Sequence, residues 1–312
     1  MSNIHQRINW KQFIITICSL IFIGICFSSV SASEEMIITY RSPESENDKR
    51  YDYDNALLKL AMEKTEKEYG YYTLKPSPIM NYARAIKMAN DNTLKNFFMK
   101  LSYEDRFSEE MNMAYASFPI DLGIVGYRVC FACPEVKEKI TDVKTLDDLR
   151  KFTHGQGRGW SDVQILRHNN FEVHEIDAYE SLFKMVAAKR FDLFCRGTNE
   201  LLDEYNAHKH IDNFTYDTSI SIAYPLPRFF YTHKSCKTAL ERVNMGLKIA
   251  YSDGSLKKLW LKNYQDSIDF VKLDKRKIYN IENPLLKKLN FDFQKYFYKP
   301  VNETAEVGEI RE

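Results

Sequence analysis

The sequence predicts a two-lobed α/β protein, and three observations support this fold class. Strand-like and helix-like patterns alternate along residues 36–102, which is typical of a parallel sheet with crossover helices. A second alternation of the same kind occupies residues 142–195. The chain has 312 residues, which suits two lobes of about 100–150 residues each after removal of a leader. Its 20 tyrosines and 20 phenylalanines can fill large cores.

Residues 1–32 have the layout of a secretory signal peptide. A short basic region precedes an apolar run over residues 13–27, and small residues lead to Ala32, after which cleavage is expected. The apolar run is 15 residues long, shorter than the roughly 20 that a membrane-spanning helix needs. This disfavours the alternative of a membrane anchor. A lipid anchor would need a small residue before a cysteine, which neither leader cysteine has. We therefore expect a periplasmic protein.

The first alternation begins directly after the leader. Residues 36–40 (MIITY) are apolar enough for a buried strand, and residues 53–69 have apolar positions at helical spacing that end at Gly70. The pattern then predicts a strand over residues 71–74, a helix over 80–89 and a strand over 96–102.

The second alternation begins with a helix over residues 142–152, in which Thr145 and Asp148 have the spacing of a capping box. A glycine-rich turn is expected at residues 155–159. The remaining predictions are a helix over residues 161–169 opened by Ser161, a strand over 171–176, a helix over 179–189 and a strand over 191–195.

Pro225 and Pro227 interrupt the chain before a third set of elements. We expect a strand over residues 228–232, a helix over 238–251, a turn at Asp253-Gly254 and a helix from Ser255 to about Tyr264. Residues 301–312 are charged and are expected to form a flexible tail.

Charge and cysteine content exclude several classes of function. With 44 basic and 43 acidic residues, the chain has a net charge of only +1, which does not indicate a basic surface for a nucleic acid. Histidines and cysteines lack the spacing of a metal site, so neither a metal nor a cofactor is expected. Cys130 and Cys133 follow a strand-like segment, which favours a structural role over a disulfide or a catalytic dithiol. The pairing of these cysteines with each other or with Cys195 and Cys236 stays open.

Four segments resemble, in their order and spacing, the extracellular solute-binding proteins of ABC importers, in the amino-acid-binding branch (family 3). They are Tyr103-Glu104-Asp105-Arg106, Pro119-Ile120 with Gly123 and Gly126-Tyr127-Arg128, Phe191 to Gly197 (FDLFCRG), and Gly246-Leu247 with Asp253-Gly254-Ser255. The resemblance extends from about Met36 to Tyr264. It implies a type II periplasmic-binding fold with two hinge crossovers. Lobe 1 would comprise residues 34–125 and 226–300, and lobe 2 residues 126–225.

The resemblance also implies a ligand cleft between the lobes and places Arg106 on a ligand carboxylate. The alternative is a surface arginine paired with Glu104 or Asp105. Arg41 follows the first strand, where that lobe often contributes to the cleft.

In the second lobe, the loop before residue 161 would hold the ligand with a helix N-terminus, which favours anions. Trp160 would form a wall and Ser161 a contact. The alternative is a tight turn capped by Ser161. Asp192 would hold a ligand ammonium unless it faces the core, whereas Arg196 in the cleft would favour a di-acid or another anion.

We expect a monomeric, non-enzymatic binding protein that delivers a small polar, carboxylated solute to the membrane permease of an ABC importer. One alternative is a sensor lobe that reports the solute to a signalling partner. Another is an enzyme of the dehydratase kind, with Glu104 or Glu200 as the general acid.

Overall fold

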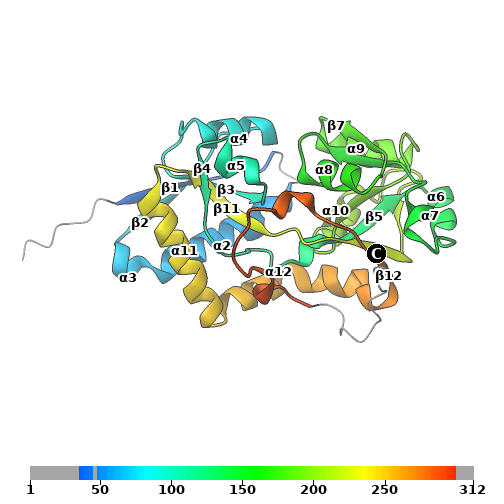
Figure 1. Cartoon of the computed structure of the whole chain (residues 1–312). Coiled ribbons are helices and arrows are strands. Elements are labelled where there is room, and N and C mark those ends of the chain that lie inside the picture. Colours follow the sequence, from blue (N-terminus) through cyan, green and yellow to red (C-terminus); the bar gives the residue numbers. More distant parts are fainter. Residues whose placement is uncertain (1–34, 45–47, 300–312) are drawn as a thin grey trace, which may run out of the picture. The chain divides into compact units, whose positions relative to one another are not determined.

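The first lobe is built on a five-stranded sheet with mixed strand directions. The structure is a computed structural model that describes residues 35–44 and 48–299 (Figure 1). The predicted signal peptide and C-terminal tail lie outside the described residues. The strand order is β2 (Tyr72–Pro76), β1 (Met36–Tyr40), β3 (Phe97–Ser102), β11 (Arg228–His233) and β4 (Met113–Tyr115). Strands β1, β2 and β3 run parallel, and β11 runs antiparallel to β3 and β4.

The helices of this lobe are α2 (Asp52–Lys64), α3 (Glu66–Tyr69), α4 (Tyr82–Asn90), α5 (Asp105–Glu109), α11 (Lys237–Ser252) and α12 (Ser255–Val271). Helices α2 and α11 pack closely because Gly246 leaves room for the backbone of Ala61. A Cβ atom at position 246 would lie 2.0 Å from the Ala61 carbonyl oxygen. The glycine therefore sets the distance between these helices.

The second lobe contains a sheet with the order β12 (Lys277–Asn280), β10 (Ile220–Ala223), β5 (Tyr127–Ala132) and β8 (Phe194–Gly197), and β9 (Thr215–Tyr216) also pairs with β5. Strands β6 (His154–Gly157) and β7 (Val173–Ile176) form a separate parallel pair. The helices are α6 (Pro134–Ile140), α7 (Leu146–Leu149), α8 (Ser161–His168), α9 (Tyr179–Ala187) and α10 (Leu201–His208).

Two of the segments that connect the lobes are the crossovers that the fold class requires. The chain enters β5 through Gly126 and returns through residues 224–227 into β11. The two segments are in contact, since the Tyr224 N–H donates to the Gly126 carbonyl at 3.2 Å. A Cβ atom on Gly126 would lie only 2.3 Å from the backbone carbonyl oxygen of Tyr224. The predicted two-lobed α/β fold is confirmed.

The C-terminal part departs from the predicted division into lobes. Residues 226–300 were assigned to lobe 1, but β12 pairs in parallel with β10 at the edge of the second sheet. Tyr279 and Ile281 are buried in the core of the second lobe, which explains this position. After β12 the chain reaches the first lobe again, where Phe291 packs against the cluster that contains Phe229.

Local predictions differ at the glycine-rich segment. Residues 154–157 form β6 instead of a turn, because Gly155 and Gly157 lie against the rings of Phe191 and Trp160. Trp160, not Ser161, is the N-cap of α8, and no side chain caps this helix. The capping box of Thr145 and Asp148 is present as predicted.

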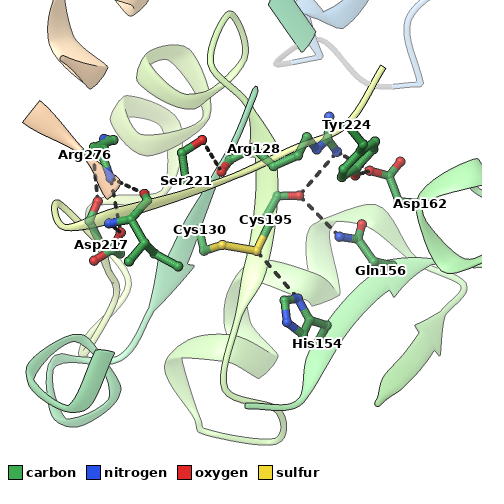
Figure 2. The surroundings of a disulfide bond; sticks show 11 residues. Arg128, Cys130, His154, Gln156, Asp162, Cys195, Asp217, Ser221, Tyr224 and Arg276 are labelled. Carbon is green, nitrogen blue, oxygen red and sulfur yellow. Dashed lines mark hydrogen bonds and ion pairs between the residues drawn. A yellow bond between two sulfur atoms is a disulfide. The ribbon is translucent and has the colours of Figure 1, made fainter. Parts of the chain in front are cut away.

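Cys130 and Cys195 form a disulfide between the facing strands β5 and β8 (Figure 2). The sequence leaves the pairing open and favours a structural role without a disulfide for Cys130, and the observed bond corrects that preference. Cys133 and Cys236 are buried free thiols. Within residues 35–44 and 48–299, no helix has the length and apolar character to cross a membrane.

Candidate functional site

A cavity of about 80 Å³ lies between side chains of the two lobes. The first lobe contributes Arg41, Arg50, Tyr51, Tyr82, Lys100, Leu101, Ser102 and Arg228, and the second lobe contributes Trp160, Ser161, Asp162, Arg196 and Glu200. A larger cavity of about 870 Å³ shares Arg50, Lys100 and Glu200 with it. The larger volume is in the range of about 300–1,000 Å³ typical of ligand pockets. The two cavities therefore adjoin, and residues of both lobes line each of them.

Arg41 lines the cavity and has a buried donor without a partner in the described part of the chain. It directly follows β1 and is 3% exposed, and its guanidinium lies 4.6 Å from the ring centre of Tyr51. Its Nη2 donates to Glu44 at 2.8 Å, whereas the buried Nε has no hydrogen-bond partner among the described residues. An unsatisfied buried donor costs about 1–3 kcal/mol. A ligand oxygen at this position would remove that cost.

Lys100 and Arg228 bring two more positive charges, both of which are paired. The Lys100 ammonium lies 2.7 Å from Asp54, and Arg228 Nη1 lies 3.1 Å from Glu200. Burial raises the pKa of Asp54 to about 6, although Lys100 partly opposes this shift. Burial would also raise the pKa of Glu200, but the charges of Arg196, Arg228 and Arg128 hold it well below its usual range. Glu200 is therefore a carboxylate at neutral pH, which argues against its use as a general acid.

Arg196 also lines the cavity, but its positive charge is paired with two carboxylates. Its Nε and Nη2 donate to Glu204 at 2.8–2.9 Å, and Nη2 lies 3.1 Å from Glu200. Its guanidinium lies over the Trp160 ring, 4.8 Å from the ring centre. The pair of carboxylates fixes the arginine, so it shapes the cavity more than it supplies a free positive charge.

A buried ion pair supports the second-lobe side of the cavity (Figure 2). Arg128 on β5 lies 2.7 Å from Asp162 in the first turn of α8, and the Tyr224 hydroxyl donates to the same carboxylate. Arg128 also donates to the Cys195 carbonyl beside the disulfide. A further hydrogen bond joins it to the Val125 carbonyl at the crossover. These contacts hold the start of α8 against both crossover segments.

The structure brings four of the six predicted ligand residues to the cavity, namely Arg41, Trp160, Ser161 and Arg196. Arg106 is not among the lining residues, because its Nε is bound to Glu104 at 2.5 Å, the alternative that the sequence left open. Asp192 also lies elsewhere and accepts from the backbone and hydroxyl of Thr153, both at 2.8 Å. A ligand role for any of the six stays a prediction.

Several lining residues were not identified from the sequence as ligand contacts, namely Arg50, Tyr51, Tyr82, Lys100, Asp162 and Arg228. For two of these residues the sequence contains a feature that could have indicated a position in the cavity. Lys100 interrupts the apolar strand FFMKLS, where an unpaired charge would be costly, and Arg228 directly follows the Pro227 break. The others are recognised only when distant segments meet.

Comparisons with known proteins support the fold. No family model and no curated protein matches the chain. An ancestral arginine-binding protein bound to arginine is similar with a TM-score of 0.53 and 15% identity, over 74% of this chain and 99% of that one. A probable extracellular amino-acid-binding protein of an ABC transporter from Bacillus subtilis has a TM-score of 0.51 and 15% identity, over 74% and 99%. A histidine kinase sensor domain similar to periplasmic binding proteins has a TM-score of 0.52 and 11% identity, over 75% and 97%.

Proposed function

We propose that this chain is an exported solute-binding protein that captures a small polar, carboxylated solute and delivers it to the membrane permease of an ABC importer. The observation that carries the proposal concerns Arg41, which lines a cavity between the lobes and whose buried Nε has no hydrogen-bond partner among residues 35–44 and 48–299. An arginine offers a planar set of donors that suits a carboxylate. Amino-acid-like solutes combine such a group with further polar atoms.

Binding by closure follows from the arrangement of the lining residues. A solute in contact with Arg41 from one lobe and with Trp160 and Ser161 from the other stabilises the closed state over the open one. The crossover segments are the places where the backbone turns as the cleft opens. The permease would then recognise the closed, loaded form.

Two further parts of the proposal, export of the protein and delivery to a permease, are supported by different observations. The leader layout of residues 1–32 favours secretion, and a structural neighbour is described as a probable ABC transporter binding protein. The histidine kinase sensor domain among the neighbours supports a second candidate, a lobe that reports the solute to a signalling partner. Co-purification of a permease or of a kinase with the tagged, solute-loaded protein distinguishes these roles.

The test is a thermal melt of the purified, ligand-stripped chain against amino acids, di-acids, sugars and polyamines. A solute at 100 times its Kd stabilises the protein by about 2.7 kcal/mol, which is a shift of several degrees for a chain of this size. The shift should disappear in Arg41→Ala and persist in Arg84→Ala, an exposed arginine on α4. A well-folded protein that responds to no solute contradicts the proposal. Turnover of a cyclic carboxylic acid would instead favour an enzyme.

A further inference from the structure

Glu104 is a first-lobe carboxylate that reaches the second lobe. It is the N-cap residue of α5 and is 1% exposed. Its Oε1 accepts a hydrogen bond of 2.6 Å from the hydroxyl of Ser161, the first residue of α8. Its Oε2 accepts from Arg106 at 2.5 Å and from Gln164 at 3.5 Å. Two donors of α8 and one of α5 therefore share a single carboxylate between the lobes.

The first turn of α8 is a favourable place for this carboxylate. The first N–H groups of a helix have no partner within the helix, and the positive end of the dipole stabilises a nearby negative charge. An anionic solute would be attracted to the same end. Because Glu104 already lies beside it, the protein supplies internally the charge that a solute would otherwise bring.

A second connection joins the lobes beside this contact. Asn169, at the C-terminal end of α8, donates its side-chain amide to the Glu282 carbonyl at 2.8 Å. Six residues further, the Lys288 N–H donates to Asp105 on α5 at 3.2 Å. Leu285, between them, packs against the second-lobe core, and Leu286 packs against the first-lobe core. The same pair of helices is thus linked by a chain segment as well as by Glu104.

The contact also fixes the hydrogen-bonding character of Ser161, which lines the cavity. A hydroxyl has one proton and two acceptor lone pairs. Since the Ser161 proton is directed at Glu104, only the lone pairs are available to a solute. A solute atom that contacts the Ser161 hydroxyl must then be an N–H or O–H donor, because a carboxylate oxygen would face an acceptor there.

We infer that Glu104 is a built-in carboxylate that holds the two lobes closed without solute and selects the solute. The selected solute carries an anionic group for Arg41 and a hydrogen-bond donor for Ser161, which describes amino and hydroxy acids but not simple dicarboxylic acids. The selection rests on the proposed function. The closing role does not, because it concerns the solute-free protein.

The closing role is tested by small-angle X-ray scattering of the solute-free chain. Glu104→Ala is expected to have a larger radius of gyration than the wild type, and Glu110→Ala, an exposed neighbour after α5, is expected to match the wild type. Acetate or formate, but not chloride at equal concentration, should return Glu104→Ala to the wild-type value by replacing the lost carboxylate. Ser161→Ala provides a milder variant and should open the protein in the same way. Wild-type dimensions in both Glu104→Ala and Ser161→Ala would overturn the closing role.

The selecting role is tested by calorimetry with acids of matched chain length, namely alanine and lactate against malonate, and asparagine against succinate. The wild type should prefer the donor-bearing acids, and Glu104→Ala should move the ratio of affinities at least tenfold toward the dicarboxylates. An unchanged ratio, or a wild type that prefers dicarboxylates, would overturn the selection. If no acid binds the wild type, the proposed function and the selection fail together, while the scattering result still decides the closing role.

Discussion

Arg128 and Asp162 form an ion pair, with 2.7 Å between Nη2 and Oδ1, that joins the first crossover strand to the first turn of α8. Both side chains are buried. The Tyr224 hydroxyl, from the second crossover segment, donates to the same oxygen at 2.5 Å. Both crossovers are therefore tied to the helix that lines the cavity, so motion at the crossovers and the position of Ser161 are mechanically linked.

Removal of the charge on Asp162 should strongly destabilise the protein. In Asp162→Asn the guanidinium of Arg128 stays buried with its nearest counter-ion neutralised, and loss of one partner of a buried pair costs about 3–5 kcal/mol. Tyr224→Phe removes one hydrogen bond to a charged group and should cost about 1.5–3 kcal/mol. Urea unfolding measures both. Asp91→Asn removes a surface pair with Lys87 and serves as the control, which should unfold at close to the wild-type urea concentration. Equal stability of Asp162→Asn and the control would contradict the structural role of the pair.

Much of the fold could be predicted from the sequence because its strands are short apolar runs between charged helices. Residues 36–40 form β1 as expected, and the strand predicted at 228–232 is β11 with one residue more. The predictions were wrong where packing between distant segments decides the structure. Helix α12 continues past Tyr264 to Val271, since Ile268 and Val271 are buried against the core.

The candidate site was less predictable, because its charges are paired across long sequence separations. Position in a motif placed Arg106 in the cleft, but the neighbouring Glu104 accepts from it and at the same time from Ser161 of the other lobe. Sequence alone does not reveal which buried cations have a donor without a partner among the described residues, as Arg41 and Arg128 do. That property of Arg41 depends on Tyr51 and Glu44, which surround it in the folded chain.

His154 should make stability depend on pH. It is fully buried, and burial lowers its pKa from 6.5 to about 4, although the charge of Asp192 acts in the opposite direction. On acidification, His154 therefore binds a proton near pH 6.5 in the unfolded chain but only near pH 4 in the folded chain. The contribution of the neutral imidazole is complete above pH 6.5 and is lost as the pH falls toward 4, by about 3 kcal/mol in total.

The measurement is the free energy of unfolding of wild type and His154→Gln between pH 4 and pH 7. The wild type should lose more stability on acidification than the variant, with a difference in slope of up to about 1.4 kcal/mol per pH unit. Parallel curves would show that His154 is not buried in its neutral form. His174→Gln, at a partly exposed histidine on β7, is the matched control and should follow the wild type.

A methyl group at position 246 should disturb the first lobe. In Gly246→Ala the new Cβ would meet the Ala61 carbonyl of α2, a backbone atom that cannot move alone. Helices α2 and α11 would have to separate, and such overpacking costs typically about 1–3 kcal/mol. Gly159→Ala adds a methyl group in open space but at a backbone φ of +76°, so its cost should come from the backbone alone. Equal stability of Gly246→Ala and wild type in urea unfolding would contradict the close helix contact.

The disulfide between Cys130 and Cys195 should stabilise the second lobe against unfolding. The two residues are 65 positions apart, and a cross-link over a loop of that length removes unfolded-state entropy equivalent to about 4 kcal/mol. Cys130→Ser with Cys195→Ser should lower the free energy of unfolding by about this amount, and a reducing agent should do the same to the wild type. Alkylation under denaturing, non-reducing conditions should label Cys133 and Cys236 but not the linked pair, as peptide mass spectrometry would detect.

A cross-link between Cys130 and Cys133 would contradict this pairing. The bond would then lie at the end of one strand, and β5 and β8 would be held together by their backbone hydrogen bonds alone. In that case the double variant should lose little stability, because the closed loop would be too short to restrict the unfolded chain.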